Sequence, residues 1–386
     1  MLSFFFRLVP ALGLFFISYS VGMLYDVKEA SAFLYELVII NILSIFVCGG
    51  ANVAILKLAA DEHLRDYFLY VLVNILISLP LVYIAIFLLD VTLFVYCYMF
   101  QVLSLYFSAA LKSQQRFLVG SFFEYGLAGL LVSGLVVLLE LNINSVKVFY
   151  AFVLALLVLV QSSFLVKGIV GSNRGFNYKK CLEGGYTFAL VGLYGMINVW
   201  AVVFYISANP ELFIEYNLTT RLVLFLGFIV STIDGISMVK MGAWIRAGDV
   251  RSIDDYMRMF REKVFPFVLI VFMAGLAILS ILFWNGYSRI LGFNLILVPM
   301  LVLPYVSYFY FGPSGSYLIA LGGERVNHFF NLSVSVFQIV FIAVVIMFFE
   351  YNEMLVYFMV FSFQMCSVIK FWVYERWIKK IEGLRC

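Results

Sequence analysis

Twelve apolar stretches, most of them about 20 residues long, fill this chain almost from end to end. A hydrocarbon layer of roughly 30 Å needs about 20 helical residues per crossing, so twelve crossings use almost all of the 386 residues. The stretches are continuously apolar rather than alternating, which predicts helices and not the strands of a membrane barrel. The sequence therefore predicts an all-α polytopic membrane protein with about 12 transmembrane helices.

Charged and polar clusters mark the ends of the expected spans. Composition leads to the same class, because a chain that is 65% hydrophobic and 12% charged cannot cover its apolar surface in water. The first apolar run has no preceding basic region, so we interpret it as a span and not as a cleaved leader. The expected spans cover residues 4–25, 31–56, 68–89, 91–111, 117–139, 148–170, 182–206, 214–240, 264–284, 294–320, 327–348 and 354–373.

The distribution of Lys and Arg predicts the orientation, because basic residues near span ends are retained on the cytoplasmic side. Of the 25 Lys and Arg residues, only Lys28, Lys147 and Arg289 fall on the opposite side, and Arg221 falls within a span. With an even number of spans, both termini are then expected in the cytoplasm.

Enzymatic, metal-binding and nucleic-acid-binding functions are not expected. The only histidines, His63 and His328, fall near the expected cytoplasmic face, and the five cysteines show no paired spacing. Phosphate-binding glycine loops, nucleophile motifs and metal-ligand spacings do not occur in the sequence. The net charge of +3 follows from membrane orientation and does not indicate a nucleic-acid partner. We therefore expect no catalytic residue, no metal and no cofactor.

The two halves of the sequence look related. The segments SAALKSQQRF and YLIALGGERVNHF place Arg116 and Arg325 at matching points, each between two expected spans. Halves with an even number of spans have the same orientation and are related by an axis along the membrane normal. We expect an N-terminal six-helix bundle at 1–170, a cytoplasmic linker at 171–181 and a C-terminal six-helix bundle with a short tail at 182–386, arranged around a central cavity.

Polar residues inside the spans indicate what such a cavity binds, because they are costly in lipid and usually face a bundle interior. Arg221 lies in the expected eighth span, with Asn217 one turn before it on the same face. Tyr194 and Asn198 form a similar stripe in the seventh span. We expect these side chains to line a cavity. The alternative is structural pairing for Arg221 and bonding to neighbouring helices for the amides.

Three acidic residues lie in three different spans: Glu36, Glu124 and Asp234. They are candidates for ion or proton coupling, and the alternative is that they pair with cations inside the bundle. Four glutamines in mid-span are expected to connect neighbouring helices: Gln101, Gln161, Gln338 and Gln364.

The loop between the eighth and ninth spans, VRSIDDYMRMFREKVF, predicts a short amphipathic helix. Ile253, Met257 and Phe260 recur at helical spacing on one face. Ser252 followed three residues later by Asp255 resembles a capping box that would begin the helix. We expect this helix at the inner membrane surface, as a lipid-held connector or as a regulatory segment.

Several segments resemble the O-antigen and polysaccharide flippases of the multidrug, oligosaccharidyl-lipid and polysaccharide exporter superfamily. These segments are NILSIFVCGGANVAILKLAA, SAALKSQQRF, YNLTTRLVLFLGFIVSTIDG followed by MGAWIRAGDV, and FGPSGSYLIALGGERVNHFFNLSVSVFQIVF. The resemblance extends over essentially the whole chain. The outer turn YDVKEASAF departs from the glycine-rich turn that is frequent in the family.

The resemblance implies a transporter that moves an undecaprenyl-diphosphate-linked oligosaccharide across the bacterial cytoplasmic (inner) membrane by alternating access of two halves. A cationic and aromatic cavity suits a diphosphate with sugars, because Arg binds phosphate bidentately and Tyr offers a stacking surface. Arg221 is the first candidate for the anionic group. The lesser candidates are Arg7, Lys57 and Arg289, and Arg7 alternatively reaches the inner surface. Membrane lipids and other polysaccharide-assembly proteins are the expected partners.

Two other functions remain open from the sequence. One is a multidrug or small-molecule cation antiporter of the same superfamily, which would exchange cations at embedded carboxylates. The other is a scaffold without transport activity in a polysaccharide-assembly complex. Dye efflux would support the first, and silent substitutions of buried charges would support the second.

Overall fold

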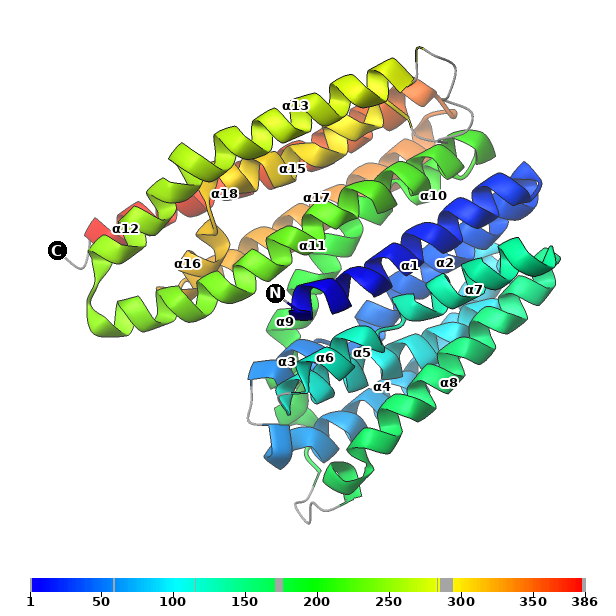
Figure 1. Ribbon diagram of the computed structural model, residues 1–386, viewed down its shortest axis with the longest axis horizontal. Coiled ribbons are helices and arrows are strands. Elements are labelled where there is room, and N and C mark those ends of the chain that lie inside the picture. Colours follow the sequence, from blue (N-terminus) through cyan, green and yellow to red (C-terminus); the bar gives the residue numbers. More distant parts are fainter. Residues whose placement is uncertain are drawn as a thin grey trace. The chain divides into compact units, whose positions relative to one another are not determined.

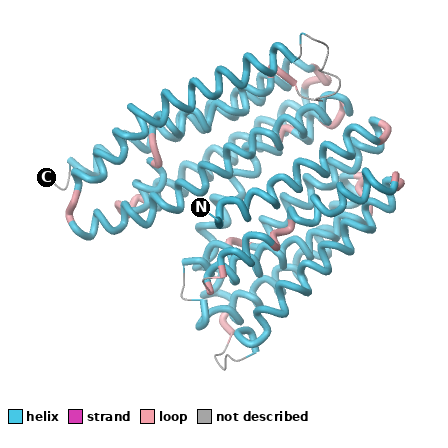
Figure 2. Tube along the Cα trace, viewed as in Figure 1, coloured by secondary structure: helices cyan, strands magenta, loops and turns pink. Residues whose placement is uncertain are grey.

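The computed structural model describes residues 2–57, 60–114, 116–170, 176–282, 284 and 294–383. Within these ranges the chain is helical, with short loops and no strand (Figures 1 and 2). Seven described helices are long and apolar enough to cross a membrane, and four more apolar helices are shorter. Together with the 38-residue helix Pro210–Ala247, they correspond to the twelve expected spans. The all-α, multi-pass membrane fold is confirmed.

The chain divides into two compact units. The first comprises Met1–Val203 and Asn209–Ile214, and the second comprises Phe204–Ala208 and Glu215–Cys386. The expected linker at 171–181 therefore does not coincide with the boundary between these units. Residues 182–200, expected to begin the second bundle, lie in the helix Tyr178–Trp200, which belongs to the first unit.

The first unit contains the helices of the expected first six spans and of the seventh. They are α1 (Leu2–Leu24), α2 (Val27–Cys48), α3 (Ala51–Lys57), α4 (Ala60–Leu89), the 3-10 helix η1 (Leu93–Cys97), α5 (Tyr98–Ser113), α6 (Phe117–Phe122), α7 (Gly126–Leu139), α8 (Ile143–Val170) and α9 (Tyr178–Trp200). The four-residue helix α10 (Val203–Ile206) follows at the boundary of the units.

The second unit is built around one long helix and a helical hairpin. Its elements are α11 (Pro210–Ala247), which begins with residues of the first unit, α12 (Val250–Met259), the π-helical turn η2 (Phe260–Val264), α13 (Phe265–Leu282), α15 (Leu297–Phe311), α16 (Ser314–Ala320), α17 (Glu324–Phe348) and α18 (Glu353–Gly383). In Figure 1, α13, α15 and α18 run side by side.

Glycine allows α1 and α7 to pack at very short distance. A Cβ on Gly13 would lie 2.0 Å from the carbonyl oxygen of Gly126, and a Cβ on Gly126 would lie 2.1 Å from that of Pro10. A Cβ on Gly129 would lie 2.6 Å from the carbonyl oxygen of Gly13. Only residues without a side chain permit backbones to approach so closely, which is the usual role of small residues at helix crossings in membranes.

A second glycine contact explains why α9 belongs to the first unit. The expected second span is broken between α2 and α3 at Gly49 and Gly50, which have φ of 57° and 75° in the left-handed region. A Cβ on Gly50 would lie 2.1 Å from the carbonyl oxygen of Gly185 in α9. The break therefore brings the α2–α3 turn directly against the α9 backbone.

The expected amphipathic helix is present as α12, and its apolar face is buried by protein. Ile253 is 1% exposed and packs with Tyr317, Leu318 and Tyr374 of α16 and α18. The expected cap is wrong, because Asp249 and not Ser252 occupies the N-cap, where its carboxylate accepts from the Ser252 N–H at 3.0 Å. α12 is therefore a packed element of the second unit and does not use this face to rest on lipid.

Candidate functional site

Helix α11 carries the residues that the sequence indicated first. Asn209 accepts from the Leu212 N–H at 3.2 Å and Pro210 opens the helix, a favourable pair for an N-terminus. One to three turns later, Asn217 is fully buried, Thr220 is 2% exposed and Arg221 is 6% exposed. These residues therefore lie inside the protein, and that they line a substrate cavity stays a prediction. Asn217 and Arg221 are one turn apart, so their side chains occupy the same face.

Asn217 is a buried amide with no hydrogen bond to its surroundings. Neither its side-chain nitrogen nor its oxygen has a hydrogen-bond partner in the described part of the chain. A buried polar group left unsatisfied costs about 1–3 kcal/mol, so such a group usually has a functional partner. The amide and the neighbouring guanidinium together offer donors for an anion and an acceptor for a hydroxyl.

Hydrogen bonds fix the start of α11 within the second unit. Asn294 donates its side-chain amide to Glu215 Oε2 at 2.9 Å and to the Tyr357 hydroxyl at 3.1 Å. Its backbone N–H donates to Thr219 Oγ1 at 3.1 Å. These bonds connect α11 with the residues just before α15 and with α18. Glu215 is therefore held by a neutral amide, and it lies two residues before Asn217, on the other side of the helix from Asn217 and Arg221.

The first embedded carboxylate, Glu36, is bound by a lysine of another helix. Lys147 Nζ of α8 lies 2.7 Å from Glu36 Oε2, and the Thr92 N–H donates to Glu36 Oε1 at 2.8 Å. Lys147 also lies 3.4 Å from Thr92 Oγ1 and 5.8 Å from the centre of the Phe94 ring. The Glu36 side chain is 4% exposed, so the pair is largely removed from solvent.

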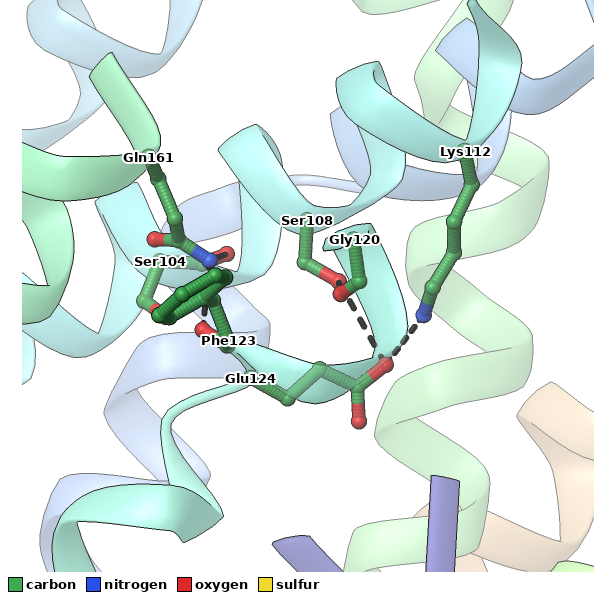
Figure 3. Close-up of polar contacts among 7 residues, drawn as sticks. All are labelled: Ser104, Ser108, Lys112, Gly120, Phe123, Glu124 and Gln161. Carbon is green, nitrogen blue, oxygen red and sulfur yellow. Dashed lines mark hydrogen bonds and ion pairs between the residues drawn. The ribbon is translucent and has the colours of Figure 1, made fainter. Parts of the chain in front are cut away.

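The second carboxylate, Glu124, lies in a break of the fifth span between α6 and α7. Figure 3 shows its carboxylate directed at Lys112 of α5, with which it forms an ion pair, and at Ser108, whose hydroxyl is 3.3 Å from Glu124 Oε1. Gln161 of α8 donates to the Phe123 carbonyl at 2.7 Å, which satisfies a backbone oxygen that the helix break leaves open. Gln161 thus connects neighbouring helices, as the sequence predicted.

The third carboxylate, Asp234, lies in the middle of α11. Its Oδ1 accepts from the Tyr308 hydroxyl at 3.0 Å and from the Ser316 hydroxyl at 2.9 Å. Lys370 of α18 interacts with it electrostatically. Glu36 and Glu124 therefore each form an ion pair with a lysine, which is the structural pairing that the sequence left as an alternative, whereas Asp234 accepts hydrogen bonds from two hydroxyls.

The structure places the remaining candidates as follows. Tyr194 and Asn198 lie on α9 of the first unit and are 5% and 7% exposed. Arg7 is in the first turns of α1, and Lys57 is the last residue of α3. Arg289 lies outside the described residues. Single helices bring together two pairs of candidates, Tyr194 with Asn198 on α9 and Asn217 with Arg221 on α11.

Sequence reasoning did not identify the lysines that pair with the acids. For Lys147 a signal was present: it is one of three basic residues on the side of the membrane that disfavours them. A basic residue that departs from this rule is a candidate for an internal partner. Lys112 does not depart from this rule, because it falls at a span end that is expected on the cytoplasmic side, where lysine is common.

No family model matches the chain, and no curated protein sequence matches it. Several solved structures match the chain. A Vibrio cholerae MATE transporter mutant is 14% identical, with the match covering 99% of this chain and 95% of that chain at a TM-score of 0.58. An outward-facing multidrug resistance MATE family transporter of the MOP superfamily is 12% identical, with coverage of 99% and 97% and a TM-score of 0.57. The chain has the MATE transporter fold.

A eukaryotic MATE transporter gives the same result at 16% identity, with coverage of 99% and 97% and a TM-score of 0.52. At these identities the likeness is one of fold. The MATE fold covers the chain almost from end to end. It leaves the superfamily, the flippase subfamily and the substrate as proposals.

Proposed function

We propose that this protein is a secondary transporter that works by alternating access. The observation that carries the proposal is the MATE fold, which covers 99% of this chain and 95% of a solved MATE transporter. The apolar helices support a multi-pass position in the membrane. We further propose the bacterial inner membrane, with both termini in the cytoplasm, from the distribution of Lys and Arg.

The first candidate substrate is a small organic cation exported in exchange for protons or sodium. The comparisons favour this candidate, because one of the matching structures is described as a multidrug resistance transporter. Glu36, Glu124 and Asp234 are the proposed coupling groups. Since Glu36 and Glu124 are each paired with a lysine, protonation of either carboxylate would remove one half of an ion pair and free the helices that it joins. Coupling would then act through helix packing and not through a shared acidic cluster.

The second candidate is the lipid-linked oligosaccharide diphosphate that the sequence resemblance implies. It is supported by the buried Arg221 beside the unsatisfied amide of Asn217, a combination that suits an anion with hydroxyl groups. Tyr194, Asn198, Arg7, Lys57 and Arg289 are further proposed contacts. An inside-negative potential would favour outward movement by about 2.3 kcal/mol per charge per 100 mV. Other polysaccharide-assembly proteins are proposed partners for this candidate only.

One experiment compares the two candidates. Purified full-length protein in proteoliposomes is given either a fluorescent cationic dye or a labelled polyprenyl-diphosphate oligosaccharide, with proton, sodium and electrical gradients imposed in turn. Dye movement driven by an ion gradient supports the antiporter, and diphosphate movement driven by the potential supports the flippase. Failure of both under all gradients would contradict transport and support the scaffold without transport activity.

A further inference from the structure

The second unit contains a cavity of about 310 Å³ that none of the proposed transport residues lines. Its wall consists of the end of α12, the π-helical turn η2, the break between α15 and α16, and the last turns of α18. We call it the α12–α18 cavity. Three observations about its walls indicate a ligand site: an unusual backbone, an unsatisfied hydroxyl and a balanced set of charges.

Two departures from regular helix form the cavity. The turn η2 is a π-helix that carries Arg261 and Glu262, and π-helical turns occur frequently at functional sites. Opposite it, Gly312 has a φ of 69° and ends α15. A Cβ there would lie 3.1 Å from both the sulfur and the terminal carbon of Met257, so the close approach of α12 depends on glycine.

The unsatisfied hydroxyl belongs to Ser314, the first residue of α16. The residue is 1% exposed, lines the cavity, and its Oγ has no hydrogen-bond partner in the described part of the chain. A buried hydroxyl can donate one hydrogen bond and accept others, and leaving it unpaired is unfavourable. A ligand oxygen in the cavity would satisfy it.

Charges of both signs surround the cavity in equal number. The cations are Arg258, Arg261 and Lys379, and the acids are Asp254, Glu262 and Glu375. Glu375 bonds Arg261 and Lys379, each at 3.1 Å, and Arg261 also stacks 5.3 Å from the centre of the Tyr310 ring. Arg258 and Glu262 are 3.8 Å apart on exposed side chains, a contact worth only tenths of a kcal/mol that a ligand can replace.

The position of the cavity indicates a membrane ligand. It lies where the apolar helix α13 gives way to the charged α12 and where α18 changes from apolar to basic. Trp372 and Trp377 of α18 are half exposed there, with Arg376 and Lys380 stacked on them at 3.7 and 4.9 Å. Tryptophans and cations mark the level of lipid headgroups.

We infer that the α12–α18 cavity binds the headgroup of a zwitterionic phospholipid with a primary ammonium, that is, a phosphoethanolamine lipid. Arg258, Lys379 and the Ser314 hydroxyl bind the phosphate, and Asp254 and Glu262 accept from the ammonium. The equal number of cations and acids disfavours a purely anionic headgroup, because the acids would repel it. Met257, Phe311 and Ile378 supply an apolar wall for the lipid backbone. The inference does not depend on the proposed transport function.

Lipid binding to the purified full-length protein tests the inference. Native mass spectrometry and thermal unfolding in detergent would compare phosphatidylethanolamine, phosphatidylcholine and phosphatidylglycerol with identical acyl chains. We expect phosphatidylethanolamine to bind about tenfold more tightly than phosphatidylcholine, whose methylated ammonium cannot donate to Asp254 and Glu262. Equal binding of the three lipids, or preference for phosphatidylglycerol, would overturn the inference.

Matched variants localise the binding. Lys379→Gln and Ser314→Ala should each reduce phosphatidylethanolamine binding about fivefold or more, because each removes a donor to the phosphate. Lys380→Gln is the control, since Lys380 is the next residue of α18 but does not line the cavity. Equal loss in Lys380→Gln would show a general charge effect and contradict the site. Free phosphoethanolamine that competes as well as the lipid would overturn the assignment to a membrane lipid.

Discussion

Lys147 of α8 and Glu36 of α2 form an ion pair in which Lys147 Nζ lies 2.7 Å from Glu36 Oε2. The two residues are far apart in the sequence, and their side chains are largely removed from solvent. The distribution of basic residues predicts this lysine on the side of the membrane that otherwise carries few of them. Its position is therefore explained by its partner and not by the rule that sets orientation. Because the pair is buried, removing either partner alone should change the stability of the protein.

Lys147→Ala should destabilise the protein by about 3–5 kcal/mol, because it leaves the Glu36 carboxylate buried without its cation. The double variant Lys147→Ala with Glu36→Gln should recover a large part of this loss, since no buried charge remains. Denaturation in detergent micelles would measure both. Lys28→Ala removes an exposed lysine of α2, the helix that also carries Glu36, and should change the stability little. Additive losses in the double variant would contradict the pairing.

Gly126→Ala should destabilise the first unit strongly, because the new Cβ would lie 2.1 Å from the Pro10 carbonyl oxygen and force α1 away from α7. Gly134→Ala in the same helix meets no atom within 4 Å and should be neutral or stabilising by up to about 1 kcal/mol. Thermal unfolding of the two variants is the measurement. Similar effects at both positions would show that the α1–α7 contact does not depend on glycine.

Gln161→Leu should cost about 1–3 kcal/mol, because it leaves the Phe123 carbonyl without its donor at the break between α6 and α7. Ser163→Ala, two positions further along, changes an exposed residue and should have little effect. Hydrogen exchange at residues 120–126 would report the loosening directly. Unchanged exchange in Gln161→Leu would mean that another group satisfies this carbonyl.

For a diphosphate substrate, Arg221→Ala should abolish transport and Arg221→Lys should retain part of it, because lysine keeps the charge but loses the bidentate geometry. If the substrate is the diphosphate, complementation of a flippase-deficient strain measures the loss. If it is a cationic dye, Arg221→Ala should instead leave efflux intact or increase it. Lys240→Ala, an exposed position on the same helix, should transport normally in either case.

Asp249 should make the start of α12 sensitive to acid. Hydrogen bonds from the hydroxyl and the backbone N–H of Ser252 lower the pKa of Asp249. Its contribution is therefore present above the unfolded value of about 3.9 and is lost as the pH falls through the lower folded pKa. The protection of α12 against hydrogen exchange, relative to the intrinsic exchange rate at each pH, should be constant between about pH 5 and 7 and should fall in stronger acid.

Asp249→Asn is the control for this pH dependence, because asparagine is also a good N-cap but does not titrate. Protection of α12 in this variant should no longer change in acid. Asp255→Asn, an exposed position in the same helix, should keep the wild-type response. An acid response retained in Asp249→Asn would assign it to a different group.

Hydropathy alone determined the membrane class, the approximate spans and the burial of Arg221 and Asn217. These features follow from composition and local periodicity, because lipid requires continuous apolar helices and places polar side chains inside. The apolar face of α12 was readable for the same reason. The sequence could not reveal that this face packs on Tyr317 and Tyr374, since a helix pattern shows which side is apolar but not what covers it.

The tertiary structure alone decided the helix breaks and the partners of the buried charges. An apolar run such as 117–139 reads the same whether the helix is continuous or interrupted at Glu124. The pairs Lys147–Glu36 and Lys112–Glu124 depend on the rotation and depth of neighbouring helices, and shifting a helix by one residue turns its side chains by about 100°. Local sequence fixes the helices, whereas packing between them fixes the pairs.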